Sequence, residues 1–363
     1  MTTKPLHLFV VFLACALVCS AAHTTPRPKK KTVPTRTAEQ NTASGPAYAQ
    51  RDDAMAAASD IANRRDLSLQ WVRRAIARAH YSPQIAKLIL PPPAGIAKNW
   101  RLYRSRFVEP IRIKAGVKFW QANRESLDRA EKQTGVPAEV IVGIIGVESI
   151  YGQHMGSYRV IDALTTLAFD FPANHPRAIE RSAFFKSELE QFLSLMHRTG
   201  IDPLIPLGSY AGAMGMSQFM PSSWVKYAID YDGDSKIDLF NSPADAIGSV
   251  ANYFRAFHWQ PGMPTHYTVR FDEGKLDLDS LLASDILPTH SSAGLAAKGV
   301  LLEDAAPQHA GPMALIELQN GDASPSYVAG TENFYVITRY NWSSYYAMAV
   351  IELGQEVAKA MRP

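Results

Sequence analysis

The sequence predicts a mainly helical α+β protein, in which a helical body carries a small β-rich insertion. Apolar residues recur at helical spacing through much of the chain between residues 54 and 261. Segments with strand character appear only after residue 261. Of the 363 residues, 47% are apolar. A chain of this length and composition buries a large core, so disorder of the whole chain is excluded.

The first 22 residues have the pattern of a secretory signal. Lys4 precedes an apolar run over residues 6–18, and small residues follow at positions 20–22. The run is too short for a membrane span. A lipoprotein acylated on Cys19 or Cys15 is the alternative. Because these are the only two cysteines, the exported chain would have none for a disulfide or a metal site.

Residues 23–49 are expected to form a disordered basic linker, rich in Pro, Thr, Lys and Ser. The formal net charge is +3, but Lys4 and residues 23–45 together carry +5. The remaining residues therefore carry −2. A nearly neutral body argues against nucleic acid as a partner.

In the helical part, we expect a helix over residues 54–79, a proline-rich break at residues 91–95 and more helices between residues 100 and 134. Pro137 should open the next helix, since proline is favoured in a first helical turn. A long helix with one apolar face is expected over residues 178–198.

Strands are expected over residues 267–271, 313–319 and 334–338, the last after a turn at Gly330. A helix over residues 345–361 should close the chain. The resulting division is a signal (1–22), a linker (23–49), an N-terminal helical domain (50–135), a catalytic core (136–261), a β-rich region (262–330) and a C-terminal segment (331–363).

Glu148 is the candidate catalytic residue. It ends the run VIVGIIGV, which is apolar on every face and therefore predicts a helix buried on all sides. Desolvation at the end of such a helix favours the neutral acid and raises the pKa of the carboxyl. A general acid needs this property at neutral pH. The alternative is a helix-terminal glutamate that turns to solvent.

Residues 208–224 are a second candidate site segment. Small residues alternate with aromatic residues and methionines, and no charged residue occurs among them. Glycines allow close backbone approach, and Ser209 and Gln218 supply neutral hydrogen-bonding groups. This suits a neutral ligand rich in hydroxyls and amides. A tight helix-packing turn is the alternative.

Four segments in the same order resemble the B-type lytic transglycosylases of bacterial cell walls, which have a lysozyme-like fold. They are GIIGVES (143–149), GSYAGAMGMSQFMPSS (208–223), DAIGSVANYF (245–254) and NFYVITRYN (333–341). The resemblance runs from about residue 100 to the C-terminus. It implies a lysozyme-like helical core and a periplasmic enzyme, either free or lipid-anchored. Peptidoglycan glycan strands would be the substrate, and cell-wall synthesis proteins are possible partners of what we expect to be a monomer.

The resemblance further implies non-hydrolytic cleavage of the β-1,4 bond between N-acetylmuramic acid and N-acetylglucosamine. Glu148 would protonate the glycosidic oxygen and then accept the proton of the muramic C6 hydroxyl, which leaves a 1,6-anhydro ring. No catalytic cofactor is implied. The glycan-contacting positions that the resemblance gives are Ser209, Gln218, Phe219, Tyr253, Tyr340, Asn341, Tyr346, Tyr103 and Arg181.

Two features depart from the family pattern or leave alternatives. Residues 170–182 look longer than usual and Phe184 replaces an expected tyrosine, so Arg177 is an alternative to Arg181. Asp162 and Asp170 are the nearest candidates for a second carboxylate, which a hydrolytic muramidase would need. We expect Asp162 instead to cap the next helix or to form a salt bridge there. The alternative function outside the enzymes is that of a non-catalytic peptidoglycan-binding scaffold.

A calcium-binding loop is expected at residues 230–238, which resemble the first half of an EF-hand. Asp230, Asp232 and Asp234 would supply side-chain oxygens, and Lys236 a backbone carbonyl. Asn241 stands where an EF-hand has glutamate, and the resemblance suggests Asp245 as the closing ligand. The ion would be structural. An acidic surface turn is the alternative.

Overall fold

The computed structural model describes residues 45–91, 97–303 and 306–362. The expected signal, residues 23–44 of the expected linker and most of the expected break at 91–95 lie outside these ranges. The described chain is mainly helical with two small antiparallel sheets, which confirms the predicted fold class. No helix within these ranges is both long enough and apolar enough to cross a bilayer.

The first helices flank the body. They are α1 (Asp52–Arg65), α2 (Leu69–Ala77), α3 (Pro83–Leu88), α4 (Trp100–Ser105), α5 (Pro110–Ala122) and α6 (Arg124–Thr134). The expected helix over residues 54–79 is thus two helices. Asp66 has a left-handed backbone (φ 51°) that ends α1, and the Ser68 hydroxyl caps α2 by accepting from the amide of Trp71.

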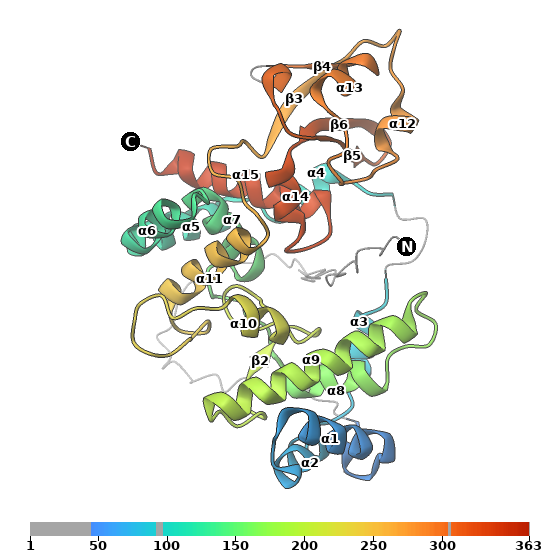
Figure 1. Ribbon diagram of the computed structural model, residues 1–363, viewed down its shortest axis with the longest axis vertical. Helices are drawn as coiled ribbons and strands as arrows, with labels where there is room; N and C mark the ends of the chain where they lie inside the picture. The colour runs from blue at the N-terminus through green and yellow to red at the C-terminus, as the bar shows by residue number, and fades with distance from the viewer. Residues whose placement is uncertain (1–44, 92–96, 304–305, 363) are drawn as a thin grey trace, which may run out of the picture.

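The next elements build the centre. They are α7 (Ala138–Ser149), β1 (Tyr158–Arg159), α8 (Val160–Phe169), α9 (Ala178–Thr199), β2 (Leu207–Gly208), α10 (Pro221–Tyr227) and α11 (Pro243–Ala256). Pro137 stands just before α7, as its N-cap. Figure 1 shows α8 and α9 running side by side below α10, with α1 and α2 beneath them.

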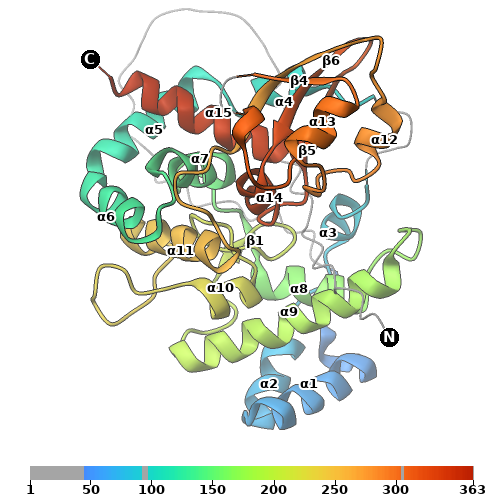
Figure 2. The ribbon, with the colours of Figure 1, turned by 45° about the horizontal axis from the view of Figure 1, so that its top comes forward.

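The β-rich part lies at the opposite end of the molecule from α1 and α2 (Figures 1 and 2). Its elements are β3 (His266–Phe271), α12 (Leu278–Leu282), α13 (Ser292–Ala297), β4 (Val300–Leu302), β5 (Ala314–Asn320) and β6 (Ala323–Gly330). The four strands form an antiparallel sheet in the order β4-β3-β6-β5. A short 3₁₀ turn, η2 (Ala306–Gln308), follows β4, and another, η1 (Tyr48–Gln50), precedes α1.

One strand prediction and one turn prediction are wrong. Gly330 is the last residue of β6, paired with His266 and Ala314, and makes no turn. Residues 334–338 lie in a helix, α14 (Glu332–Thr338), whose N-terminus the Thr331 hydroxyl caps. A short, nearly continuous apolar run does not distinguish a strand from a buried helix by its periodicity. The last helix, α15 (Ser344–Ala360), agrees with its prediction to within one residue at each end.

The expected linker extends too far. The amide of Gly45 donates to the carbonyl of Tyr81 (2.8 Å), and Tyr48 is 1% exposed with its hydroxyl bonded to Asp170. A buried tyrosine with a partnered hydroxyl stabilises the ordered chain here, so the body includes at least residues 45–49.

The expected boundary at residue 135 does not separate two cores. Buried side chains of α1 to α6 belong to the same apolar core as those of α7 to α11, α14 and α15. A second, smaller core lies between the four-stranded sheet and helices α12 and α13, around Leu281, Leu295 and Leu315. Among the described residues, the β-rich part is therefore the one region with a separate core.

Candidate active site

Glu148 lies at the end of α7, on the last turn of a helix that is buried along most of its length. Ten of the twelve α7 residues are buried, and Glu148 itself is only partly exposed. The helix delivers the carboxyl from an apolar environment, as its sequence predicts.

Helices α7 and α15 cross at unusually short range because of two glycines. A β-carbon on Gly143 would lie closer than 3.0 Å to the carbonyl oxygen of Val350, and one on Gly354 would overlap the carbonyl of Glu139 in the same way. The two helices run antiparallel through these contacts. One step further along this crossing, the Tyr346 hydroxyl donates a hydrogen bond to Glu148 Oε1 at 2.5 Å.

Burial raises the pKa of Glu148 to about 7, and the hydrogen bond from Tyr346 opposes part of that rise because it stabilises the carboxylate. A carboxyl that titrates near neutrality can both give and take a proton there. Burial, together with the adjacent carboxyl, holds the pKa of Tyr346 well above its ordinary value, so this side chain remains a hydroxyl donor.

Asp162 and Asp170, the candidate second carboxylates, are engaged elsewhere. Asp162 forms a salt bridge with Arg159 (2.7 Å) in the first turn of α8, which confirms the structural role expected for it. Asp170 pairs with Arg51 (2.9 Å) and accepts from Tyr48. These partners tie both carboxylates to neighbouring elements, and neither is bonded to Glu148.

The segment over residues 208–220 folds into tight turns against the end of α7. Ser149 is 1% exposed, and its hydroxyl donates to the carbonyl of Met216 at 2.7 Å, which joins the segment to the residue after Glu148. Ser209 is buried, and its hydroxyl accepts from the amides of Ala211 (3.3 Å) and Ala213 (3.0 Å). Its role in the structure is thus to shape the turn.

Gln218 also stabilises the segment. Its side-chain Nε2 donates to the carbonyls of Met155 (3.1 Å) and Gly215 (2.8 Å), and its backbone is left-handed with φ 47°. A non-glycine residue in this region needs such support from its surroundings. The side-chain nitrogen is the donor in both of these hydrogen bonds.

Three of the predicted aromatic residues form a cluster behind Glu148. The rings of Phe219, Tyr253 and Tyr340 have centroids 4.8 to 5.8 Å apart, and Tyr340 stacks on Tyr346 at 6.5 Å. Tyr253 donates to the carbonyl of Arg339 (2.6 Å) and Tyr340 to that of Ser217 (2.5 Å). Phe219 is 2% exposed. Phe219 thus packs inside this cluster, and its contact with a glycan stays a prediction.

Asn341 follows this cluster and differs from it in one respect. It is 7% exposed, and its side-chain Oδ1 has no hydrogen-bond partner among the described residues. A buried acceptor without a partner costs free energy unless a ligand or water satisfies it. Asn341 Oδ1 is thus suited to accept a hydrogen bond from an N–H or O–H group of a ligand.

Tyr103 and Arg181 lie on other elements. Tyr103 of α4 is half-buried and packs against Trp100 and Tyr345, the neighbour of Tyr346. Arg181 of α9 is 9% exposed, with its guanidinium over the ring of Phe185 at 5.2 Å. The alternative, Arg177, instead pairs with Glu180.

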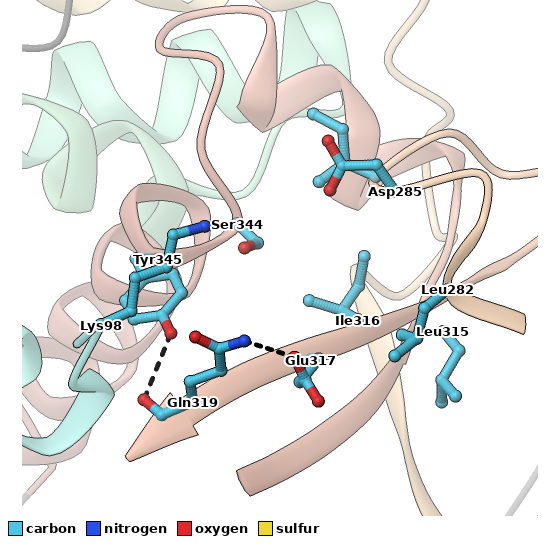
Figure 3. Close-up of a pocket in the computed structure, with 10 residues that line it drawn as sticks. Lys98, Leu282, Asp285, Leu315, Ile316, Glu317, Gln319, Ser344 and Tyr345 are labelled. Atoms are coloured by element: carbon cyan, nitrogen blue, oxygen red, sulfur yellow. Dashed lines mark hydrogen bonds between the residues drawn. The ribbon is translucent and has the colours of Figure 1, made fainter. Parts of the chain in front are cut away.

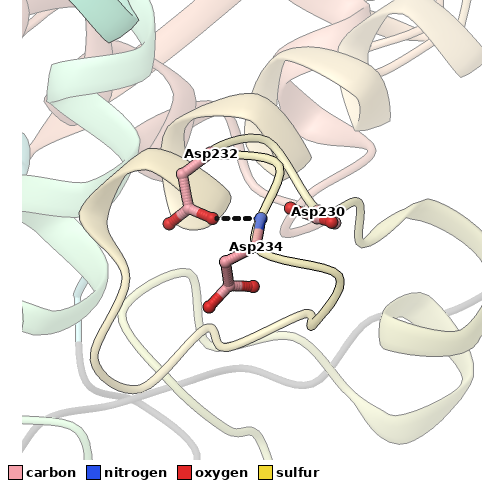
Figure 4. Close-up of side chains that lie close together, drawn as sticks. All are labelled: Asp230, Asp232 and Asp234. Atoms are coloured by element: carbon pink, nitrogen blue, oxygen red, sulfur yellow. Dashed lines mark hydrogen bonds between the residues drawn. The ribbon is translucent and has the colours of Figure 1, made fainter.

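The expected cation loop brings three carboxylates together. Oxygens of Asp230, Asp232 and Asp234 lie within 4.8 Å of one another (Figure 4). Each also accepts a hydrogen bond from a backbone amide of the loop, including that of Lys236, which donates to Asp234 at 2.8 Å. An all-oxygen donor set of this kind fits a hard cation such as Ca²⁺.

Asp245 is not brought into this group of three. It is 1% exposed in the first turn of α11, and its oxygens accept from the amides of Tyr231 (2.7 Å) and Asp238 (2.8 Å). It therefore braces both ends of the loop from within. Its role as a ligand, and that of the Lys236 carbonyl, stay predictions.

A cavity of about 170 Å³ lies between β5 and the start of α15, beside Lys98, Glu317 and Tyr345 (Figure 3). Its lining includes none of the predicted site residues, so this cavity does not point to Glu148. The site is defined instead by the buried carboxyl and its hydrogen-bond partner.

The chain matches the family model described as the transglycosylase SLT domain over residues 50–355. That range includes all four motifs and Glu148. The chain belongs to the SLT transglycosylase family. This confirms the resemblance, and with it an enzyme of the transglycosylase class.

Individual members of the family are similar over most of their length. The membrane-bound lytic murein transglycosylase B of Escherichia coli is 36% identical over 334 residues, covering 86% of this chain and 84% of that protein. The structure of E. coli lytic transglycosylase Slt35 with bulgecin A has a TM-score of 0.78 at 38% identity, covering 88% and 97% of the two chains. Slt35 in complex with calcium has a TM-score of 0.76 at the same identity and coverage. Soluble lytic transglycosylase SltB1 of Pseudomonas aeruginosa is 40% identical with a TM-score of 0.76, covering 85% and 99%.

Sequence reasoning missed the residues that hold this family's site together here. Gly143 and Gly354 allow α7 and α15 to approach, and Ser149 joins α7 to Met216. Glycines inside the helical patterns of α7 and α15 were a visible signal of close approach. Which helices would meet could not be read from the glycines alone.

Proposed function

We propose that this protein cleaves the β-1,4 bond between N-acetylmuramic acid and N-acetylglucosamine of peptidoglycan without adding water. The product would carry a 1,6-anhydromuramoyl end. One observation carries the proposal: Glu148, with a pKa of about 7, is placed at the end of a buried helix against the hydroxyl of Tyr346. The names of the relatives, lytic transglycosylases, support the same reaction class.

In the first step, the protonated carboxyl of Glu148 donates its proton to the glycosidic oxygen while the bond from that oxygen to C1 breaks. A pKa near 7 keeps a large fraction of this carboxyl protonated at neutral pH. Positive charge develops at C1, where the 2-acetamido oxygen of the muramic ring can stabilise it.

In the second step, the resulting carboxylate accepts the proton of the C6 hydroxyl as that oxygen bonds to C1. Proton and bond counts balance without water, and Glu148 returns to its starting state. Tyr346 stabilises the carboxylate between the steps by the hydrogen bond it already makes. The Asn341 Oδ1 is suited to accept a ligand N–H or O–H, because the protein leaves it without a partner.

The alternative enzymatic reaction is hydrolysis of the same bond, as in a muramidase. It would need a second carboxylate about 5–9.5 Å from the first to activate water or to form a covalent intermediate. The salt bridges of Asp162 and Asp170 with Arg159 and Arg51 favour the single-carboxylate route. A non-catalytic scaffold would have no use for a half-buried carboxyl with a raised pKa.

Mass spectrometry of the products from purified peptidoglycan tests the proposal, with the wild type and Glu148→Gln compared side by side. We expect fragments one water lighter than hydrolysis products from the wild type and none from the variant. Ordinary reducing ends would establish hydrolysis instead. If both proteins bound peptidoglycan and neither cleaved it, the protein would be a non-catalytic peptidoglycan-binding scaffold.

The loop over residues 230–238 is proposed to bind calcium in a structural role. The three converging carboxylates supply oxygen donors, and Slt35 has been solved in complex with calcium. The bound cation would neutralise their mutual repulsion and fix the loop against α11.

We further propose a periplasmic location, free or lipid-anchored. Partnership with cell-wall synthesis proteins remains a proposal from the resemblance.

A further inference from the structure

The backbone just after Glu148 adopts a rare conformation. Ile150, Tyr151 and Gly152 have φ values of 49°, 57° and 87°, so three consecutive residues are left-handed. Only glycine visits this region freely, and a β-branched residue such as Ile150 is strongly disfavoured there. Such a run persists only where the surroundings hold it in place.

The side-chain ring of Tyr151 is packed tightly by the neighbouring helices. It fills a slot between α5, α7 and α15, with its ring centroid 5.2 Å from that of Phe119 on α5. A β-carbon on Gly116 of α5 or on Gly146 of α7 would lie closer than 3.0 Å to the Tyr151 hydroxyl oxygen. Two helices thus each lack a side chain where this ring inserts.

Shape, more than hydrogen bonding, retains the ring. The Tyr151 hydroxyl is buried and has no hydrogen-bond partner among the described residues. Side chains of α15 complete the slot, since the β-carbons at Gly116 and Gly146 would also meet Val357 and Leu353. A phenylalanine would fill the same space, but a small residue would leave it empty.

A second anchor holds the other side of the turn. The Ser149 hydroxyl donates to the carbonyl of Met216 (2.7 Å) and accepts from the amide of Gly152 (3.0 Å). The segment directly after Glu148 is therefore fixed at two points, by Ser149 and by the Tyr151 ring. If the ring left its slot, the backbone could relax to a right-handed form and carry the end of α7 with it.

We propose that Tyr151 is a positioning residue, whose ring, inserted between Gly116 and Gly146, holds the end of α7 so that Glu148 stays buried against Tyr346. This inference rests on the proposed role of Glu148 as the acid and base. The Tyr151 hydroxyl forms no hydrogen bond with Glu148 or with any other described residue, and the proposal gives it no contact with the substrate. Tyr151 orients the Glu148 carboxyl and keeps water away from it.

Four variants test the inference: Tyr151→Phe, Tyr151→Ala, Gly116→Ala and the double variant Gly116→Ala/Tyr151→Phe. Tyr151→Phe should stay within about twofold of wild-type kcat, since the ring still fills the slot. Tyr151→Ala should lose roughly 10- to 100-fold in kcat with KM little changed, the scale expected for an ångström-sized misplacement. Gly116→Ala should show a similar loss, because its new β-carbon displaces the ring.

The double variant is the internal control for folding and fit. Removing the Tyr151 hydroxyl removes the atom nearest to the new β-carbon, so the double variant should recover part of the kcat that Gly116→Ala loses. Recovery should be incomplete, because the Val357 side chain and the ring carbon Cζ of residue 151 would still lie closer than 3.0 Å to the new β-carbon. A general packing defect at position 116 would not be rescued in this way.

The pH profile distinguishes positioning from mere stability. In Tyr151→Ala, Glu148 should become more hydrated, so its pKa should fall from about 7 towards the ordinary value and the basic limb of kcat should move to lower pH. The same fall should be measurable without any turnover, from the pH dependence of the unfolding free energy of Tyr151→Ala with and without Glu148→Gln.

Either of two results would overturn the inference: folded Tyr151→Ala with wild-type kcat, or a loss of kcat with an unmoved pH profile. If Tyr151→Ala does not fold, the rescue of Gly116→Ala by Tyr151→Phe decides, and no rescue overturns it. Failure of the proposed function is distinguishable, since it would appear as hydrolytic products from the wild type or as turnover by Glu148→Gln.

Discussion

Gly143 on α7 lies directly against the carbonyl of Val350 on α15, so close that a β-carbon could not be accommodated. Five residues from this contact along α7 and four along α15, Glu148 receives the hydrogen bond of Tyr346. The approach of two backbones thus places an acid and its hydrogen-bond donor together. The predictions below follow from this arrangement and from the cation loop.

Gly143→Ala should destabilise the fold by about 1–3 kcal/mol, because the new methyl group overlaps backbone atoms that cannot rotate away. Alanine favours a helix by about 1 kcal/mol over glycine, so a net loss means that the overlap outweighs the propensity. Urea unfolding measures this. Gly274→Ala is the matched control, since its β-carbon would meet its nearest neighbour at an ordinary 3.5 Å. Equal stability of Gly143→Ala and the wild type would contradict the proposed close crossing.

Tyr346→Phe should raise the pKa of Glu148, because the hydrogen bond that favours the carboxylate is lost. Activity that requires the protonated acid should then persist to higher pH, with the basic limb displaced upward by about one to two pH units, since hydrogen bonds to charged groups contribute about 1.5–3 kcal/mol. The pH dependence of kcat measures the shift. Tyr345→Phe, which loses only a bond to the Gln319 carbonyl, should leave the profile in place. A downward shift in Tyr346→Phe would mean that Tyr346 favours the neutral acid.

Glu148→Gln should make the protein more stable at high pH than the wild type. The folded state binds the Glu148 proton more tightly than the unfolded state, with a pKa of about 7 against an ordinary value of 4.5. Wild-type stability is therefore full below about pH 4.5 and falls as the pH rises through 7, by about 3 kcal/mol, while the variant has no such loss. Denaturant unfolding from pH 4 to 8 measures the difference, with the exposed Glu125→Gln as control. A difference that is flat with pH would contradict a raised pKa.

Asp230→Asn/Asp234→Asn should abolish stabilisation by calcium. A site at 100 times its Kd contributes about 2.7 kcal/mol, so the wild type should melt higher with calcium than in chelator. The double variant should melt at one temperature in both conditions. Asp245→Asn should instead lose stability even in chelator, because its carboxylate accepts backbone amides of the loop. Equal melting of the wild type with and without calcium would exclude the proposed site.

The helices over residues 178–198 and 345–361 were predicted almost to the residue, because their apolar stripes are long and strongly periodic. Residues 334–338 were mistaken for a strand, because five apolar and β-branched residues fit either element and the cap at Thr331 decides in favour of a helix. The resemblance gives Phe219 as a glycan-contacting position, whereas in the structure its ring is 2% exposed and packs against Tyr253 and Tyr340. Motifs identify positions, but packing decides which atoms of them reach a ligand.

By itself the sequence determined the helical class, the placement of Glu148 at the end of a buried helix and the three carboxylates that converge in the loop, because apolar runs and charged residues are local properties of the chain. Only the tertiary structure decided that Tyr346 of α15 would be the partner of Glu148, that Asp245 would brace the loop from within, and that Tyr151 would insert between two glycines. These relationships join residues far apart in the chain. They depend on distances of a few ångströms that only the packing of whole helices sets.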